Sequence, residues 1–297
     1  MKPFDSSFEV CFRNILLATD FSPASETALQ FSLSIAKRYN ARIFLAHVVN
    51  PPAMAWTTEA VQRAVNDAWR AAHTIMTDQL IAGRLEGIEN HVVVTSGDTW
   101  DELSKMIDKF NVDLLVVGTR GRTGVMKVLL GSTAESIFRQ APCPVLTVGP
   151  KIGRSPLEHG PKRILYSTGF LPQSLQAGDY ALSLAQQQHG NLAMLHVIRE
   201  IPDSQTKRAE LERDAMEKLR SLVPPDASLS APPDLYVSFG APADAILKLT
   251  SEWKPDMIVL GVRRPEKDAR RITRATAYNV ISNAPCPVLT VKRAEDF

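Results

Sequence analysis

A stretch of glycines and basic side chains is the part of the sequence best suited to bind a phosphate. Residues 118–136, GTRGRTGVMKVLLGSTAES, hold glycines at four positions and basic side chains at three. Glycine lets the backbone approach a bound group, and the N–H groups at a helix N-terminus attract anions. Ser132 and Glu135 match a capping box that would start such a helix. The alternative is a flexible loop before an ordinary capped helix.

The spacing of these glycines differs from that of the common phosphate loops. No G-x-x-x-x-G-K-[ST] occurs in the chain, which argues against a P-loop NTPase. The G-x-G-x-x-G fingerprint of dinucleotide-binding folds is absent after the first expected strand. What remains is Gly118-x2-Gly121-x9-Gly131-Ser132.

Alternating strands and helices must position this stretch. In the first half, apolar runs predict strands at 14–19, 42–49, 90–95, 112–118 and 144–148. Helical patterns fall between them, at 23–39, 58–84, 98–110 and 132–140. Near-continuous apolar strands indicate a doubly wound α/β domain with a five-stranded parallel sheet. Ligands of such sheets bind beyond the carboxyl ends of the strands, where Asp20, Val48 and Gly118 fall.

The chain repeats itself. The octapeptide APCPVLTV occurs at residues 141–148 and again at 284–291. These two copies are 143 residues apart. Earlier in each half, ILLATDF at 15–21 matches ILYSTGF at 164–170, and these segments are 149 residues apart. That difference predicts a shorter second helix or loop in the second half. The segment KIGRSPLEHG between the repeats has the composition of a linker. We therefore predict two tandem domains, residues 1–150 and 161–297.

Composition narrows the class of protein. A formal net charge of +2 over 297 residues gives no reason to expect nucleic acid as a partner. The chain lacks an apolar run long enough for a membrane span, and its start does not resemble a signal peptide. Three cysteines without C-x-x-C argue against a disulfide framework or a zinc site, and we identify no metal ligands. We therefore expect a cytoplasmic protein with free thiols.

The glycine pattern, the acid after the first strand and the duplicated α/β unit resemble the universal stress protein family in its tandem form. The resemblance covers nearly the whole chain. It implies two adenine nucleotide alpha hydrolase-like domains that form a pseudo-dimer, with residues 144–148 and 287–291 pairing antiparallel. It also implies a homodimer or a higher homo-oligomer.

The resemblance further implies that the first half binds ATP, with Mg²⁺ at the phosphates. Asp20, which follows Thr19 in the site, would contact the adenosine, and the backbone of Val48 would meet the adenine edge. Gly118, Thr119 and Arg120 would flank the ribose. The phosphates would lie among Gly121, Arg122, Gly131, Ser132 and Thr133. The alternative for Asp20 is a turn or cap acid, although Ser22 before Pro23 is better placed as the N-cap.

The second half departs from this pattern. Gly118 is kept as Gly261, but Asp20 corresponds to Gly169. The positions of Gly121, Gly131 and Ser132 are held by Arg264, Arg274 and Ala275. We therefore predict one ATP per chain, in the first half. Residues 262–274 form a solvated charged loop, a docking surface for an acidic protein partner, or an anion site that uses side chains.

Three function classes follow from the sequence. The first is a nucleotide-binding regulatory or stress-response protein. The second is an interaction module that works without nucleotide through its dimer and partner surfaces. The third is a slow ATPase, although we identify no catalytic residue, general base or water-positioning side chain. His47 and His196 recur at equivalent strand ends, and we interpret both as structural rather than catalytic.

Overall fold

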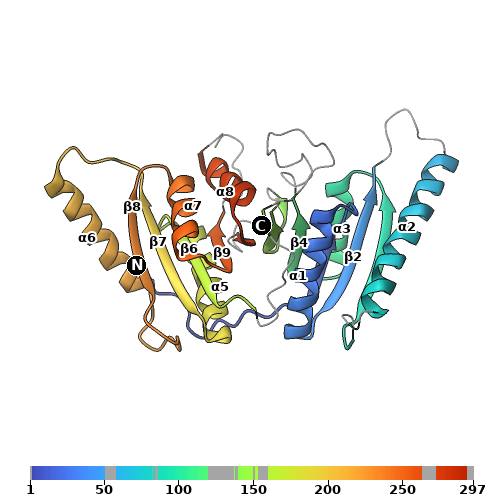
Figure 1. The fold of residues 1–297 in the computed structure, drawn as a ribbon, viewed down its shortest axis with the longest axis horizontal. Helices are drawn as coiled ribbons and strands as arrows, with labels where there is room; N and C mark the ends of the chain where they lie inside the picture. Colours follow the sequence, from blue (N-terminus) through green and yellow to red (C-terminus); the bar gives the residue numbers. More distant parts are fainter. Residues whose placement is uncertain are drawn as a thin grey trace. The chain divides into compact units, whose positions relative to one another are not determined.

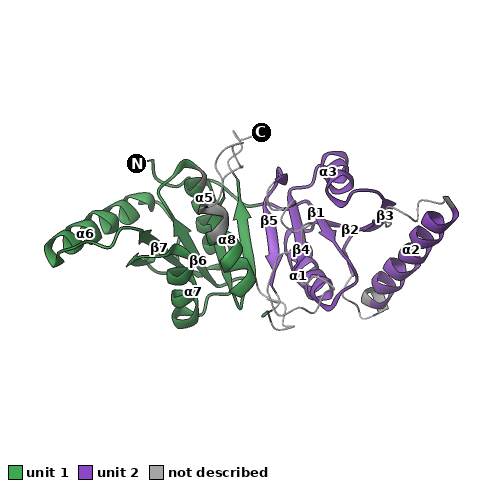
Figure 2. Ribbon diagram, turned by 90° about the horizontal axis from the view of Figure 1, so that it is seen from above, with its two compact units in different colours: residues 1–10, 151–153, 159–297 green, residues 11–150, 154–158 purple. Residues whose placement is uncertain are grey.

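The computed structural model describes residues 2–50, 58–81, 83, 86–119, 137, 140–149, 151–152, 160–262 and 272–292. Within these ranges the chain forms two compact units, coloured purple and green in Figure 2. We call residues 11–149 the N-terminal unit, and residues 2–10, 151–152 and 160–292 the C-terminal unit. Each unit is a five-stranded parallel sheet with helices packed on it (Figure 1), which confirms the predicted α/β fold.

The N-terminal unit has the strand order β3-β2-β1-β4-β5. Its strands are β1 (Asn14–Ala18), β2 (Arg42–Val49), β3 (Asn90–Ser96), β4 (Leu114–Gly118) and β5 (Val145–Val148). Its described helices are α1 (Pro23–Tyr39), α2 (Thr58–Ile81) and α3 (Thr99–Lys109). The order reverses between β1 and β4, so the topological switch point of this sheet lies at their carboxyl ends.

The C-terminal unit repeats this arrangement in the order β8-β7-β6-β9-β10. Its strands are β6 (Arg163–Thr168), β7 (Asn191–Ile198), β8 (Asp234–Phe239), β9 (Met257–Gly261) and β10 (Val288–Val291). Its helices are α5 (Pro172–Gln188), α6 (Gln205–Leu222), α7 (Pro242–Trp253) and α8 (Ile272–Asn283). The shorter second helix is confirmed, because α6 has 18 residues where α2 has 24. The switch point of this sheet lies between β6 and β9.

The central strands are covered on both faces. Ile15, Leu16 and Leu17 are all fully buried, as expected for a parallel strand between two layers of helices. Leu103 of α3 lies in one cluster with Leu16 and with apolar residues of β2, β4 and β5. The carboxyl ends of these strands are therefore anchored in a closely packed apolar core.

Local sequence fixes where helix α1 begins and ends. Ser22 is its N-cap and accepts a hydrogen bond from the Ser25 N–H at 3.3 Å, with Pro23 at the first helical position. Asn40 ends the helix in the left-handed conformation. The cap predicted at Ser22 is confirmed. It fixes the direction in which the chain leaves β1.

The first residues of the chain pack on the C-terminal unit. Phe4 is buried, and its ring meets the ring of Tyr166 edge-on at 5.5 Å. Its N–H donates to the carbonyl of Leu222 at 2.8 Å. Val10 is also buried, and its N–H donates to Ser183 Oγ at 2.8 Å. Residues 2–10, which the sequence boundary at 150 grouped with the first domain, thus pack with the second.

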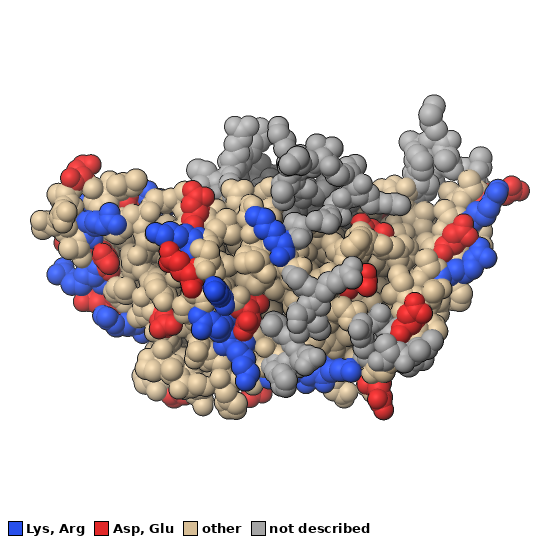
Figure 3. Space-filling model, viewed as in Figure 1, with Lys and Arg blue, Asp and Glu red and all other residues tan. Residues whose placement is uncertain are grey.

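Charged side chains are mixed over the surface. On the face shown in Figure 3, lysines and arginines alternate with acids on both units among the described residues. Within the same part of the chain, the helices are all too short or too polar to cross a membrane. The three cysteines are free thiols, as expected, with Cys11 exposed and Cys143 and Cys286 buried. The antiparallel pairing of residues 144–148 and 287–291 stays a prediction.

Candidate nucleotide site at the carboxyl ends of the strands

The described residues of the predicted site lie at strand ends on one edge of the N-terminal sheet. Thr19 and Asp20 follow β1, Val48 lies near the end of β2, and Gly118 and Thr119 end and follow β4. All five are half-buried, whereas Leu17 of β1, Ala46 of β2 and Val117 of β4 are buried. The fold therefore brings these five residues to the switch point, where α/β sheets bind ligands.

A tight turn presents Asp20 at this edge. The Thr19 N–H continues the sheet by donating to the Ala46 carbonyl at 2.9 Å. The Phe21 N–H then donates to Thr19 Oγ1 at 3.0 Å, with Phe21 at φ 61°. The chain thus turns at Asp20 and Phe21, which leaves the Asp20 side chain between the end of β1 and the start of α1.

Asp20 has a structural role in this turn. Its Oδ1 accepts hydrogen bonds from the Ser22 N–H at 3.0 Å and from Ser25 Oγ at 2.6 Å. Burial alone would raise the pKa of the Asp20 carboxyl, but the bonds from Ser22 and Ser25 outweigh it and leave the pKa below its usual value. Both bonds go to Oδ1, and within the described part of the chain Oδ2 accepts none. The carboxylate is therefore charged at neutral pH and has one oxygen to offer a ligand.

His47 supports the turn from the neighbouring strand. Its Nδ1 lies 2.7 Å from the Thr19 carbonyl oxygen, so Nδ1 carries the proton and donates it. Its ring stacks on Phe21 with the centroids 4.4 Å apart. Phe21 was not among the predicted site residues, although the motifs ATDF and STGF repeat it as Phe170.

The second repeat builds the same arrangement. His196 Nδ1 donates to the Thr168 carbonyl at 2.9 Å, and its ring stacks on Phe170 at 4.2 Å. Burial lowers the pKa of His196, so its ring is neutral at physiological pH. Both histidines pack and orient a turn, in agreement with the structural role expected for them.

Gly118 lies where a side chain would not fit. A Cβ at this position would come within 2.6 Å of the Ala24 carbonyl and 2.7 Å of the Ser25 nitrogen. The residue must be glycine because α1 crosses the end of β4 closely, whether or not a ligand is bound. Thr119 continues from it and donates from its N–H to the Val148 carbonyl at 2.9 Å.

The predicted phosphate part of the site lies outside the described residues. It comprises Arg120, Gly121, Arg122, Gly131, Ser132 and Thr133. Their assignment stays a prediction. Among the described residues, no group of three or more histidine, cysteine, aspartate or glutamate side chains is placed to hold a metal ion.

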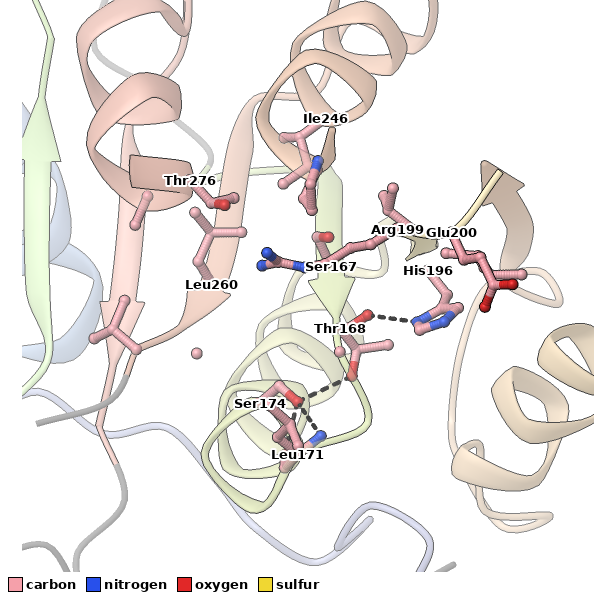
Figure 4. Close-up of a pocket in the computed structure, with 17 residues that line it drawn as sticks. Ser167, Thr168, Leu171, Ser174, His196, Arg199, Glu200, Ile246, Leu260 and Thr276 are labelled. Atoms are coloured by element: carbon pink, nitrogen blue, oxygen red, sulfur yellow. Dashed lines mark hydrogen bonds between the residues drawn. The ribbon is translucent and has the colours of Figure 1, made fainter. Parts of the chain in front are cut away.

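The C-terminal unit has a cavity at the corresponding edge (Figure 4). Its volume is about 450 Å³, and its lining includes Gly169, Val197 and Gly261, the counterparts of Asp20, Val48 and Gly118. The sequence motif is degenerate here, yet the switch point between β6 and β9 still encloses space.

Comparison with known proteins gives the family. The model of the universal stress protein family matches residues 12–149 and again residues 160–292. A universal stress protein of Methanocaldococcus jannaschii is 28% identical over 149 residues, which cover 47% of this chain and 84% of that protein. Universal stress protein A homolog 1 of Coxiella burnetii is 30% identical over 149 residues, which cover 46% of this chain and 96% of the relative.

A solved structure shares the fold along nearly the whole chain. The crystal structure of a universal stress protein from Archaeoglobus fulgidus matches with a TM-score of 0.71 and 24% identity, covering 94% of this chain and 98% of that one. Because the family model matches each half separately, the two units are two copies of one family domain. The chain belongs to the universal stress protein family, in tandem form.

Proposed function

We propose that the chain is an ATP-binding regulatory protein of the stress response, with the nucleotide held by the N-terminal unit. The observation that carries the proposal is the convergence of Asp20, Val48 and Thr119 on the switch point of that sheet. These side chains are half-buried, so a ligand can reach them while the strands behind them stay rigid.

The chemistry of Asp20 fits the sugar or base of a nucleotide. A charged carboxylate whose Oδ2 accepts no bond from the described residues can accept one from a ribose hydroxyl or an exocyclic amino group. Oδ1 is held by Ser22 and Ser25, so the acceptor is oriented before the ligand arrives. The proposal assigns the phosphates and their Mg²⁺ to the glycine-rich segment from Arg120 to Thr133.

The repeat supplies the reason to expect one nucleotide per chain. Gly169 replaces Asp20 in the second unit, which removes the acceptor. Arg274 replaces Gly131, and a side chain there would obstruct the approach of phosphate oxygens to backbone N–H groups.

The test is calorimetry with ATP and magnesium on the intact chain, together with analysis of any nucleotide released from the purified protein on denaturation. We expect a stoichiometry near one. Asp20→Asn keeps the Oδ1 acceptor of the turn and removes the second acceptor with the charge, so ATP should bind roughly tenfold more weakly or worse. Gly131→Arg, which copies the second repeat, should abolish binding.

Asp98→Asn is the matched control. It removes the same charge at the end of β3, and asparagine caps a helix as well as aspartate does. ATP affinity should not change. Absence of ATP binding by the intact chain would refute the proposal and favour an interaction module that works without nucleotide. Binding of two ATP molecules per chain would refute the prediction that only the N-terminal unit binds ATP.

The wider proposal follows the family resemblance. It includes a cytoplasmic location and assembly into a homodimer or higher homo-oligomer, which light scattering on the purified chain would test. It also retains an acidic protein partner as one role for residues 262–274, most of which lie outside the described residues.

A further inference from the structure

The cavity of the C-terminal unit has the size of a small-molecule site. Its volume of about 450 Å³ lies within the range of roughly 300–1,000 Å³ that such sites occupy. It opens at the carboxyl ends of β6, β7 and β9, with α7 and α8 contributing Ile246 and Thr276 (Figure 4). Rigid elements therefore form its walls.

Most of the lining is apolar. The larger apolar side chains are Leu171, Val197, Ile198, Ile246, Leu260 and Val262. Two polar side chains of the lining already bond to each other, because Thr168 Oγ1 donates to Ser174 Oγ at 3.1 Å. Ser167 and Thr276 add hydroxyls to the wall. Such a surface favours a ligand with an apolar body.

One positive charge reaches into this cavity. Arg199 follows β7 directly, and Figure 4 shows its side chain extending across the cavity toward Ser167 and Leu260. Within the described part of the chain, its guanidinium makes no hydrogen bond or ion pair. The neighbouring Glu200 does not neutralise it, because its carboxylate is bonded to Lys207 Nζ at 2.9 Å.

Three differences between the repeats change the charge and polarity of this site. The acid Asp20 of the first repeat becomes Gly169, and the hydroxyl of Thr119 becomes the apolar Val262. The position of Asn50 is taken by Arg199. These three changes remove a carboxylate and a hydroxyl and add a guanidinium and apolar surface. In the opposite sense, Ser167 in place of Ala18 adds a hydroxyl, and Glu200 in place of Pro51 adds a carboxylate, which is bonded to Lys207.

We propose that this cavity binds a small amphipathic carboxylate, with the carboxylate on the Arg199 guanidinium and the apolar body against the side chains of β7, β9 and α7. A guanidinium offers two parallel N–H donors that match a carboxylate. A single described cation suits a singly charged ligand, whereas a nucleotide phosphate chain needs several donors. The site is independent of the ATP site proposed above.

The test is calorimetry of the intact chain with octanoate as the probe. Octanoate should bind, and Arg199→Gln should weaken its binding roughly tenfold or more, because the charged donor is lost. Arg199 is exposed, so folding does not depend on it. Arg213→Gln, which removes the same charge from an exposed face of α6, is the matched control and should leave the affinity unchanged.

A second pair of variants tests the electrostatics at the other wall. Gly169 has room for a side chain, because the nearest atoms to a Cβ there are those of Leu171 at 3.9 Å. Gly169→Asp restores the acid of the first repeat and should weaken octanoate binding at least about fivefold, since like charges repel. Gly169→Asn has nearly the same shape without the charge and should bind octanoate as the unmodified chain does.

Three results would overturn the proposal. One is no binding of octanoate at millimolar concentration. Another is equal affinity in Arg199→Gln and Arg213→Gln, and the third is displacement of octanoate by ATP in the unmodified chain. Asp20→Asn should leave octanoate binding intact, so failure of the nucleotide proposal in the N-terminal unit would not be mistaken for failure here.

Discussion

Gly118 at the end of β4 lies directly against the backbone of Ala24 in the first turn of α1. A Cβ on Gly118 would stand 2.6 Å from both the carbon and the oxygen of the Ala24 carbonyl. Neither atom belongs to a flexible side chain, so the helix itself would have to move. The fold thus requires this glycine even before any ligand is considered.

Gly118→Ala should therefore destabilise the N-terminal unit. Overpacking of this kind costs about 1–3 kcal/mol of the free energy of unfolding. Urea unfolding followed by circular dichroism measures it. Gly169→Ala is the matched control at the corresponding edge of the other unit, where the nearest atoms lie at 3.9 Å. Equal losses in the two variants would contradict the packing argument.

Phe4→Ala should destabilise the C-terminal unit. The ring is 4% exposed, packs edge-on against Tyr166 and lies over Gly178, where it leaves no room for a Cβ. Truncation of a buried phenylalanine costs about 3–5 kcal/mol. The half-buried Phe8 provides the comparison, and Phe8→Ala should cost clearly less. A smaller loss for Phe4→Ala than for Phe8→Ala, measured by urea unfolding, would show that residues 2–10 do not pack as described.

Asp179→Asn should stabilise the chain at neutral pH. Burial raises the pKa of the Asp179 carboxyl above its usual value, although the hydrogen bond from the Asp5 N–H opposes this rise. A raised carboxyl pKa favours the folded state at low pH, and this advantage is lost as pH rises through the folded pKa. Asparagine keeps the Oδ1 acceptor for the Asp5 N–H and carries no charge. The gain in melting temperature should be present at pH 7 and shrink as the pH falls toward the ordinary pKa of aspartate; a gain that grows on acidification would contradict it.

The thiols should differ sharply in reactivity. Cys11 is exposed, whereas Cys143 and Cys286 are 8% and 6% exposed. Burial raises the pKa of Cys286 to about 12, so it forms no appreciable thiolate near pH 8. A disulfide reagent should titrate one thiol quickly in the native chain and three in denaturant. Rapid reaction of two or three native thiols would indicate that the buried cysteines are accessible.

Much of the fold could be predicted because its signals are local or repeated. Apolar runs gave the central strands to within about two residues, and Ser22 before Pro23 gave the start of α1. The octapeptide repeat revealed two domains. The strand ends then indicated the edge of the sheet where Asp20, Val48 and Gly118 lie.

Other features depend on contacts between residues far apart in the chain, and such contacts leave no periodic pattern in the sequence. Phe4 packs on Tyr166, 162 positions later in the chain, and residues 2–10 show no pattern that identifies this partner. The close approach of Ala24 to Gly118 has no sequence signal beyond the glycine itself. The second cavity was missed because the motif around Gly261 is degenerate, whereas the cavity arises from strand order, which the substitutions do not alter.

The packing of residues 2–10 changes how the two domains are connected. Because the C-terminal unit includes both the beginning of the chain and everything from residue 160 to 292, the N-terminal unit is in effect inserted into it. The repeats are consecutive in sequence but nested in structure. During synthesis, residues 2–10 leave the ribosome long before Tyr166 and Leu222 are made. They can therefore pack in their final place only after the inserted domain has been synthesised. A chain that begins at residue 160 would lack part of its own core.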